Sequence, residues 1–228
     1  MIIMKLLLDS ANIDEIKEIV DYGFIDGVTT NPELLAKEVL KGSDTEKIIT
    51  DITKIVNGEV HIQVTSNNYD DIIKQAVKIH SMGMNVIVKI PVTFNGIKAI
   101  KALKDKNIKT TATVVFNSLQ ALIAAKNNAD YVAPYISSID NIGSDGVKTV
   151  STIKAIFNNY DIKTKILAAA INNPVQLVRC GLMGIDAVTM PYSIIKKLPD
   201  YPETSINIKN FENKWSEIPE NSRTFFNK

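Results

Sequence analysis

Short runs rich in β-branched residues alternate with helical segments along the whole sequence, and this alternation restricts the possible folds more than any other feature. The runs are KLLLD, IDGVTT, EVHIQVT, NVIVKIP, KTTATVVF, DYVAPY, KTKILAA and IDAVTM, at residues 5–9, 25–30, 59–65, 85–91, 109–116, 130–135, 163–169 and 185–190. Between them, apolar residues recur at helical spacing, as at Ile13, Ile16 and Ile19. Strands that are apolar on both faces and alternate with helices are typical of a parallel sheet covered on both sides.

The number of these units predicts the fold. Eight strand and helix units in 228 residues fit an α/β protein built as a single (β/α)₈ TIM barrel, with one domain over residues 1–228. An open doubly wound sheet is the alternative. The first strand-to-helix turn, LLLDSANIDEI, contains no glycine and therefore lacks the fingerprint of a dinucleotide-binding sheet, which favours the barrel.

The segment after the eighth strand predicts an additional C-terminal helix, within about residues 201–228. The apolar residues expected on one face of it are Ile206, Ile208, Phe211 and Trp215. Phe225 and Phe226 lie beyond Pro219, where that helix is expected to end. This is more aromatic surface than one barrel needs to cover, which indicates a homo-oligomer; in the alternative, the helix folds back on its own barrel.

Composition excludes several classes of function. The chain has 26 Lys and Arg against 25 Asp and Glu, a net charge of +1, and the lysines are scattered, so we expect no nucleic-acid or membrane partner. The single Cys180 forms no intrachain disulfide, which suggests a reducing, cytoplasmic location. His61 and His80 lack metal-ligand spacing, so we expect no metal. The apolar start MIIMKLLLDS reads as a first strand rather than a signal peptide, and no apolar run is long enough to cross a membrane.

Polar residues gather where the predicted strands end, which is the catalytic face of such a barrel. They are Asp9, Thr30, Asn31, Gln63, Thr65, Lys89, Thr111, Thr113 and Tyr135. Most also have a structural explanation. Asp9 and Asn31 suit helix N-caps, the threonines suit strands, Gln63 suits a satisfied interior amide, and Tyr135 suits a packed aromatic residue.

Lys89 is the hardest of these residues to explain structurally. It lies inside the apolar strand NVIVKIP with no acidic residue near it in sequence. Lysine is rarely buried unless it is paired, and burial lowers its pKa so that more of the amine is neutral. A neutral amine attacks a ketone to form a Schiff base. The alternative is a structural Lys89 paired with Asp9 across the barrel.

The motifs LLLDSANIDEI, GVTTNPELL, VIVKIPVT, TATVVF and YVAPY resemble those of the short bacterial transaldolase family, especially its fructose-6-phosphate aldolase branch, from Asp9 to about Pro191. The resemblance implies a class I aldolase barrel in which Lys89 forms the Schiff base. It further implies that Asp9 orients the lysine and the substrate hydroxyls, and that Asn31 binds the dihydroxyacetone part of a ketose. Gln63 and Thr113 would hold a water that relays protons.

Two positions distinguish the branches of this family. Transaldolases generally have Glu where this chain has Gln63 and Phe where it has Tyr135, so the sequence sides with the aldolases. Gln63 can only position water, whereas a carboxylate carries a proton. The phenol of Tyr135 is then the expected acid and base.

The expected phosphate site departs from the family. Ser138 stands where the family has an arginine, and Ala170-Ile171-Asn172 replaces a motif with a serine and a cation. We therefore expect an acceptor aldehyde that is unphosphorylated. The full set of expected substrate-binding positions is Asn31, Thr30, Thr111, Ser138, Ala170 and Asn172.

The resulting hypothesis is a Schiff-base aldolase that acts on small-molecule ketoses and aldehydes without a cofactor. The resemblance implies a pentamer or decamer. Two alternatives stay open: a transaldolase that transfers dihydroxyacetone between sugar phosphates in the pentose phosphate pathway, and a barrel that binds a sugar without turnover.

Overall fold

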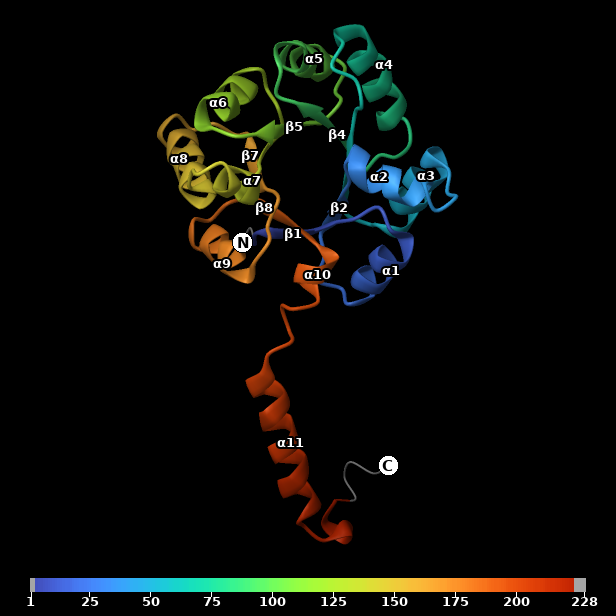
Figure 1. The fold of residues 1–228 in the computed structure, drawn as a ribbon, viewed down its shortest axis with the longest axis vertical. Helices are drawn as coiled ribbons and strands as arrows, with labels where there is room; N and C mark the ends of the chain where they lie inside the picture. The colour runs from blue at the N-terminus through green and yellow to red at the C-terminus, as the bar shows by residue number, and fades with distance from the viewer. Residues whose placement is uncertain (1–2, 224–228) are drawn as a thin grey trace. The chain divides into compact units, whose positions relative to one another are not determined.

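The computed structural model describes residues 3–223, in two compact units, Met1–Ile194 and Ile195–Lys228. The first unit is a closed barrel of parallel strands that follow one another in sequence order (Figure 1), which confirms the predicted (β/α)₈ fold. The strands are β1 (Lys5–Asp9), β2 (Gly27–Thr29), β3 (Glu59–Gln63), β4 (Val86–Pro91), β5 (Thr110–Val115), β6 (Tyr131–Pro134), β7 (Lys165–Ala168) and β8 (Ala187–Pro191).

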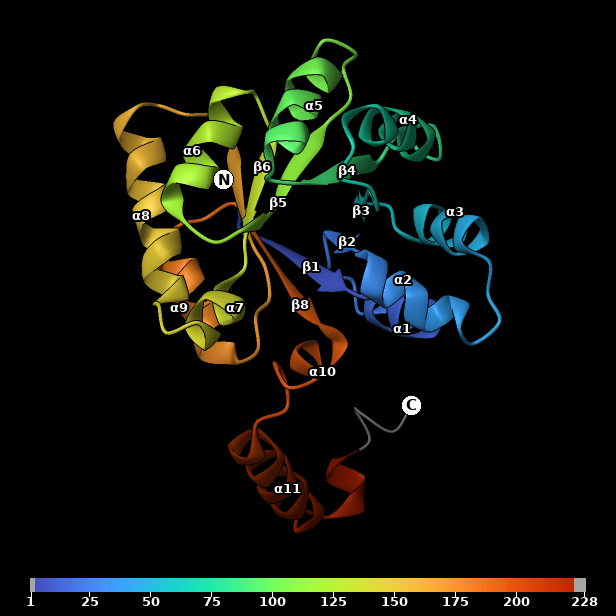
Figure 2. The same ribbon diagram turned by 45° about the horizontal axis from the view of Figure 1, so that its top comes forward.

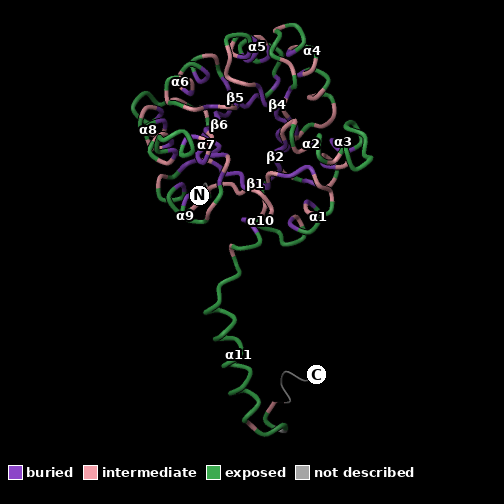
Figure 3. The backbone as a smooth tube through the Cα atoms, in the orientation of Figure 1, coloured by how far each residue is buried: buried purple, intermediate pink, exposed green. Residues whose placement is uncertain are grey.

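Helices surround the ring of strands on its outside (Figures 1 and 2). They are α1 (Ile13–Asp21), α2 (Pro32–Val39), α3 (Thr45–Ile55), α4 (Tyr69–His80), α5 (Phe94–Lys104), α6 (Ser118–Lys126), α7 (Ile136–Asn141), α8 (Gly146–Asn159), α9 (Pro174–Leu182) and α10 (Tyr192–Ile195). Most begin at an Asn, Asp or Thr whose side chain accepts a hydrogen bond from the first helical turn, for example Asn12 and Asn68. Burial follows this arrangement, since the strands and the inner helix faces are buried and the outer faces are exposed (Figure 3).

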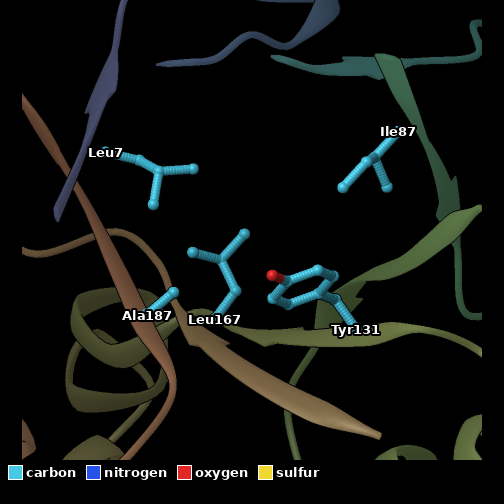
Figure 4. Packing of buried hydrophobic residues seen from close by; sticks show 5 residues of the cluster. All are labelled: Leu7, Ile87, Tyr131, Leu167 and Ala187. Carbon is cyan, nitrogen blue, oxygen red and sulfur yellow. The ribbon is translucent and has the colours of Figure 1, made fainter. Parts of the chain in front are cut away.

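A layer of apolar side chains fills the barrel interior. Leu7, Ile87, Tyr131, Leu167 and Ala187 point toward one another from five different strands (Figure 4). Side chains alternate between the two faces of a strand. The residue two positions further along each strand therefore also faces the interior, closer to the C-terminal end of the barrel.

Strand β5 contains a bulge next to the candidate site. Its register against β6 shifts between Ala112 and Val115, so β5 has one more residue than its partner in this stretch. Val114 takes up the extra length with a φ of 60°, a conformation that is unusual for a β-branched residue. Such bulges change the direction of neighbouring side chains, and Thr113 directly precedes this one.

The second unit contains α11 (Pro202–Ser216) and the short 3-10 helix η1 (Glu220–Ser222). Helix α11 confirms the predicted C-terminal helix, and it ends before Pro219 as expected. Phe225 and Phe226 lie outside the described residues, and the assignment of residues 1–228 to one domain stays a prediction. In the part of the chain that the structure describes, no helix is long and apolar enough to cross a membrane.

Candidate active site

Lys89 is the buried cation at the centre of the candidate site. It lies on β4 two residues after the interior Ile87, and only 4% of its surface is exposed. Its Nζ donates a hydrogen bond of 2.7 Å to the backbone carbonyl of Thr30. Burial lowers the pKa of the Lys89 amine, and the charge of Asp9 offsets only part of this effect. A larger fraction of the amine is therefore neutral and able to act as a nucleophile.

The structure also addresses the alternative of a structural ion pair. Among residues 3–223, no ion pair joins Lys89 to Asp9, and the Thr30 carbonyl is the acceptor that Lys89 uses. A neutral carbonyl holds the amine in place without requiring it to be charged. This arrangement favours the nucleophile over the structural cation.

Asp9 ends β1 with a carboxylate in a fixed position. Its Oδ1 accepts a hydrogen bond of 2.6 Å from the Thr29 hydroxyl, whose oxygen also lies 2.7 Å from the Thr189 hydroxyl. The charge of Asp9 favours the protonated forms of both Lys89 and Tyr135. Residues from β1, β4 and the end of β6 therefore act on one region.

Tyr135 follows β6 and meets β5 through its hydroxyl. The Tyr135 oxygen lies 3.1 Å from Thr113 Oγ1, and either hydroxyl can be the donor. Burial raises the pKa of Tyr135, the hydrogen bond with Thr113 offsets part of this, and the charge of Asp9 adds to it. The phenol therefore stays protonated at neutral pH and can donate a proton.

Gln63 ends β3 in register with Lys89 on β4. Its Oε1 is buried, and no described residue donates a hydrogen bond to it. A buried amide oxygen without a donor is unfavourable, so this atom is suited to receive a substrate hydroxyl or a water. The resemblance places the relaying water at this position, and the assignment stays a prediction.

Asn31 has the structural role that the sequence offered as one of its explanations. It is the N-cap of α2, and its Oδ1 accepts a hydrogen bond of 2.9 Å from the Leu34 backbone N–H. The Nδ2 donates to no other described residue, which leaves its N–H groups able to bind a ketose oxygen. Capping and substrate binding are therefore compatible here.

Thr30 and Thr111, which were predicted to bind substrate, are both fully buried, and Thr111 is in register with Lys89. Thr30 offers its carbonyl to Lys89, and the Thr111 hydroxyl lies 2.9 Å from His61 Nδ1. Burial lowers the pKa of His61, so the imidazole is neutral. The role of the two threonines in substrate binding stays a prediction.

The three positions expected at the phosphate end lie together. Helix α7 begins against the segment after β7, because the backbone N–H groups of Ile136 and Ser137 donate to the carbonyls of Ala169 and Ala170. Ala170 has a φ of 55°, Ser138 is half-buried on α7, and Asn172 is exposed.

Three polar residues were not predicted: Thr29 and Thr189 beside Asp9, and Gln176 beside Asn172. The sequence holds a weak signal for Thr29, which is a polar residue in the run IDGVTT; only the observed strand register places it beside Asp9. Thr189 is a polar residue in the apolar run IDAVTM. Nothing in the sequence distinguishes Gln176 from other glutamines.

Two further features lie apart from Lys89. A cavity of about 480 Å³ opens near the N-terminal ends of β5, β6 and β7, and its lining includes Lys109, Tyr131 and Lys165. It is remote from the carboxyl ends of the strands, where the polar residues converge. Among residues 3–223, no group of His, Cys, Asp and Glu side chains could hold a metal ion.

Comparison with known proteins identifies similar chains over nearly the whole length. A family model described as Transaldolase/Fructose-6-phosphate aldolase matches residues 6–227. A "Probable transaldolase" of Thermoplasma volcanium is 46% identical over 215 residues, which cover 94% of this chain and 96% of the relative. Proteins of the same name from Kosmotoga olearia and Clostridium kluyveri are 44% and 39% identical, covering 94% and 95% of this chain and 97% and 100% of the relatives.

Proposed function

Because the chain belongs to the transaldolase/fructose-6-phosphate aldolase family and is an enzyme of the aldolase or transaldolase type, we propose that Lys89 forms a Schiff base with the C2 carbonyl of a ketose. The enzyme then cleaves or forms the C3–C4 bond, with dihydroxyacetone as the donor. The observation that carries this proposal is the buried Lys89 amine, which is held by a neutral carbonyl and has a lowered pKa.

Each step of cleavage has a group in the site. The neutral Lys89 attacks C2, and uptake of one proton from solvent lets the C2 oxygen leave as water to give an iminium ion. The electrons of the C3–C4 bond then move into the iminium to leave an enamine. The proton of the C4 hydroxyl departs as the aldehyde forms. Tyr135, which is paired with Thr113, accepts that proton as it hands its own to a water on Gln63 Oε1, and the phenol later protonates the enamine carbon. Water then hydrolyses the iminium and releases dihydroxyacetone.

Gln63 and Tyr135 support an aldolase rather than a transferase. Neither position carries a carboxylate, so proton transfer falls to the phenol. The second candidate is a transaldolase, because several relatives bear the name "Probable transaldolase". The third, a sugar-binding barrel without turnover, gives no reason for a buried amine.

Two experiments test the proposal. Borohydride treatment in the presence of dihydroxyacetone should attach the donor irreversibly to the peptide that contains Lys89, as measured by peptide mass analysis. Labelling of a different lysine would contradict the assignment. Fructose and fructose 6-phosphate are then each supplied with and without erythrose 4-phosphate: an aldolase releases free dihydroxyacetone from at least one of them without the acceptor, whereas a transaldolase turns over only with it.

Two further parts of the proposal concern substrate and assembly. The acceptor aldehyde is unphosphorylated, because Ser138 and Asn172 offer hydrogen bonds but no positive charge. The protein forms a homo-oligomer, a pentamer or decamer, as the family resemblance implies. A cytoplasmic location stays a prediction that rests on the single Cys180.

A further inference from the structure

Gln176 connects the segments that carry the acceptor end of the candidate site. It is on the first turn of α9 and only 6% exposed. Its Oε1 accepts a hydrogen bond of 3.0 Å from the Asn172 backbone N–H, and its Nε2 donates at 2.9 Å to Asp140 Oδ2 and at 3.2 Å to Ser137 Oγ. One side chain therefore joins α9, α7 and the segment after β7.

The network extends one step beyond Gln176. The second oxygen of Asp140 accepts a hydrogen bond of 2.8 Å from the Gly146 backbone N–H, at the start of α8. The Ser137 hydroxyl also lies 3.4 Å from Gln176 Oε1. Every polar atom of the Gln176 side chain is thus used, as is expected of a buried amide.

A second glutamine shows which of these contacts are unusual. Gln120 has the same local position in α6: its backbone N–H donates to the Asn117 cap, and its Oε1 accepts from the Phe116 backbone N–H. Gln176 repeats both contacts with Asn173 and Asn172. Of these two glutamines, only Gln176 also donates hydrogen bonds to a neighbouring helix. The two hydrogen bonds from Nε2 are therefore not needed to cap α9, and they join α9 to α7.

We propose that Gln176 is a positioning residue that fixes the distance between Ser138 on α7 and Asn172 after β7, and so sets the enzyme's selectivity for the acceptor aldehyde. This inference rests on the function proposed above. Gln176 acts through Ser137, Asp140 and the Asn172 backbone, none of which includes the reacting atoms. Lys89 and Asp9 lie on other strands, and Tyr135 at the start of α7 is held to β5 by its own hydrogen bonds with Val115 and Thr113, so we expect activation of dihydroxyacetone not to depend on Gln176.

The test swaps the amide of Gln176 and the carboxylate of Asp140 in two steps, first with Gln176→Glu and then with Asp140→Asn added. Gln176→Glu keeps the acceptor for Asn172 but places a carboxylate against Asp140, which should separate α7 from the segment after β7. We expect the KM for glyceraldehyde to rise by about tenfold or more, while kcat changes little. In the double variant with Asp140→Asn, the new Asn side chain donates to the new carboxylate and still accepts from Gly146. The KM should then return to within about threefold of the starting value.

A second measurement, the exchange of the donor's hydrogens, distinguishes a positioning role from a general loss of structure, because only the general loss would slow the exchange. Dihydroxyacetone in D₂O exchanges its C–H protons through Lys89 without any acceptor, and NMR measures the rate. We expect the Gln176→Glu variant to keep this rate, and the Gln120→Glu control to keep both exchange and KM. Equal losses of exchange and aldol addition, or no rescue by Asp140→Asn, would overturn the positioning role. No exchange by the unmodified protein would instead refute the proposed function, and the positioning role with it.

Discussion

At the scale of single residues, Lys89 illustrates the conflict between stability and chemistry. A buried amine that must be neutral to react is protonated in the unfolded chain, where its pKa is about 10.4. The folded state therefore binds this proton more weakly than the unfolded chain does, and the difference makes the free energy of unfolding depend on pH. The hydrogen bond to the Thr30 carbonyl recovers part of this loss and fixes the direction of the amine.

The Lys89→Met variant should be inactive yet more stable than the unmodified protein at pH 7. Removing a buried amine of low pKa is expected to gain about 0.5–2 kcal/mol, and each kcal/mol corresponds to about 2–4 °C in Tm for a chain of this size. Because the pKa of Lys89 is lower in the folded state, the unmodified protein gains stability as pH rises from that lowered value toward 10.5. The difference between the two proteins should therefore shrink with rising pH in thermal unfolding measurements. A constant difference would mean that the amine is not perturbed.

The Tyr135→Phe variant should lose proton transfer while it keeps the Schiff base. We expect aldol cleavage to fall by roughly 10²-fold, because the phenol is replaced by a ring that cannot carry a proton. Trapping of dihydroxyacetone on Lys89 by borohydride should be unchanged, which separates the two steps. The matched control is Tyr160→Phe at an exposed tyrosine. A cleavage rate close to that of the unmodified protein would assign the proton transfer to another group.

At the scale of the elements, close approach between neighbouring strands depends on glycine. A Cβ on Gly27 at the start of β2 would lie 2.2 Å from the Glu59 backbone oxygen of β3, whereas a Cβ on Gly181 in α9 would lie 3.7 Å from the Met4 side chain. Gly27→Ala should therefore destabilise the fold by about 2–4 kcal/mol, since the backbone must move. Gly181→Ala should stabilise it by up to about 1 kcal/mol through helix propensity. Urea unfolding measures the change in the free energy of unfolding for each variant. Equal changes would contradict the conclusion that β2 and β3 approach too closely at Gly27 for a Cβ.

We expect the segments after β6 and β7 to decide the preference for the acceptor. A charge-assisted hydrogen bond contributes about 1.5–3 kcal/mol, so the two missing cations should weaken phosphate binding by roughly 3–6 kcal/mol, or about two to four orders of magnitude. We expect kcat/KM for glyceraldehyde to equal or exceed that for its 3-phosphate, with dihydroxyacetone as the donor. Ser138→Arg should shift the ratio toward the phosphate. A preference of roughly 10²-fold or more for the phosphate in the unmodified protein would show that another cation, such as Lys148, binds it.

At the scale of the whole molecule, the second unit carries the question of assembly. No side chain of α11 is buried, and its apolar residues Ile206, Ile208 and Phe211 are exposed. Apolar surface of this kind is usually covered. We expect light scattering to give a mass of five or ten chains rather than 25.2 kDa. A single-chain mass would favour the alternative in which the helix covers its own barrel.

Much of this molecule was determined by local sequence. Each predicted run contains or closely overlaps an observed strand, because β-branched residues and strand length are local properties. The same local signals placed Lys89 on an apolar strand, Asn31 and Pro32 at the start of a helix, and α11 before Pro219. Motifs around these residues were sufficient to indicate the family.

The tertiary structure alone decided which of these residues meet. Lys89 bonds to a carbonyl 59 positions away, and Gln176 to residues 36 and 39 positions away. Closure and strand register of the barrel determine such pairs, and no local pattern encodes them. The same holds for Val114, whose positive φ arises from a bulge against β6 and opposes its own β-strand preference. The sequence by itself therefore determined the elements and singled out Lys89. The closed barrel decided what holds Lys89 and what joins the segments that carry Ser138 and Asn172, because those contacts exist only once distant strands are brought into register.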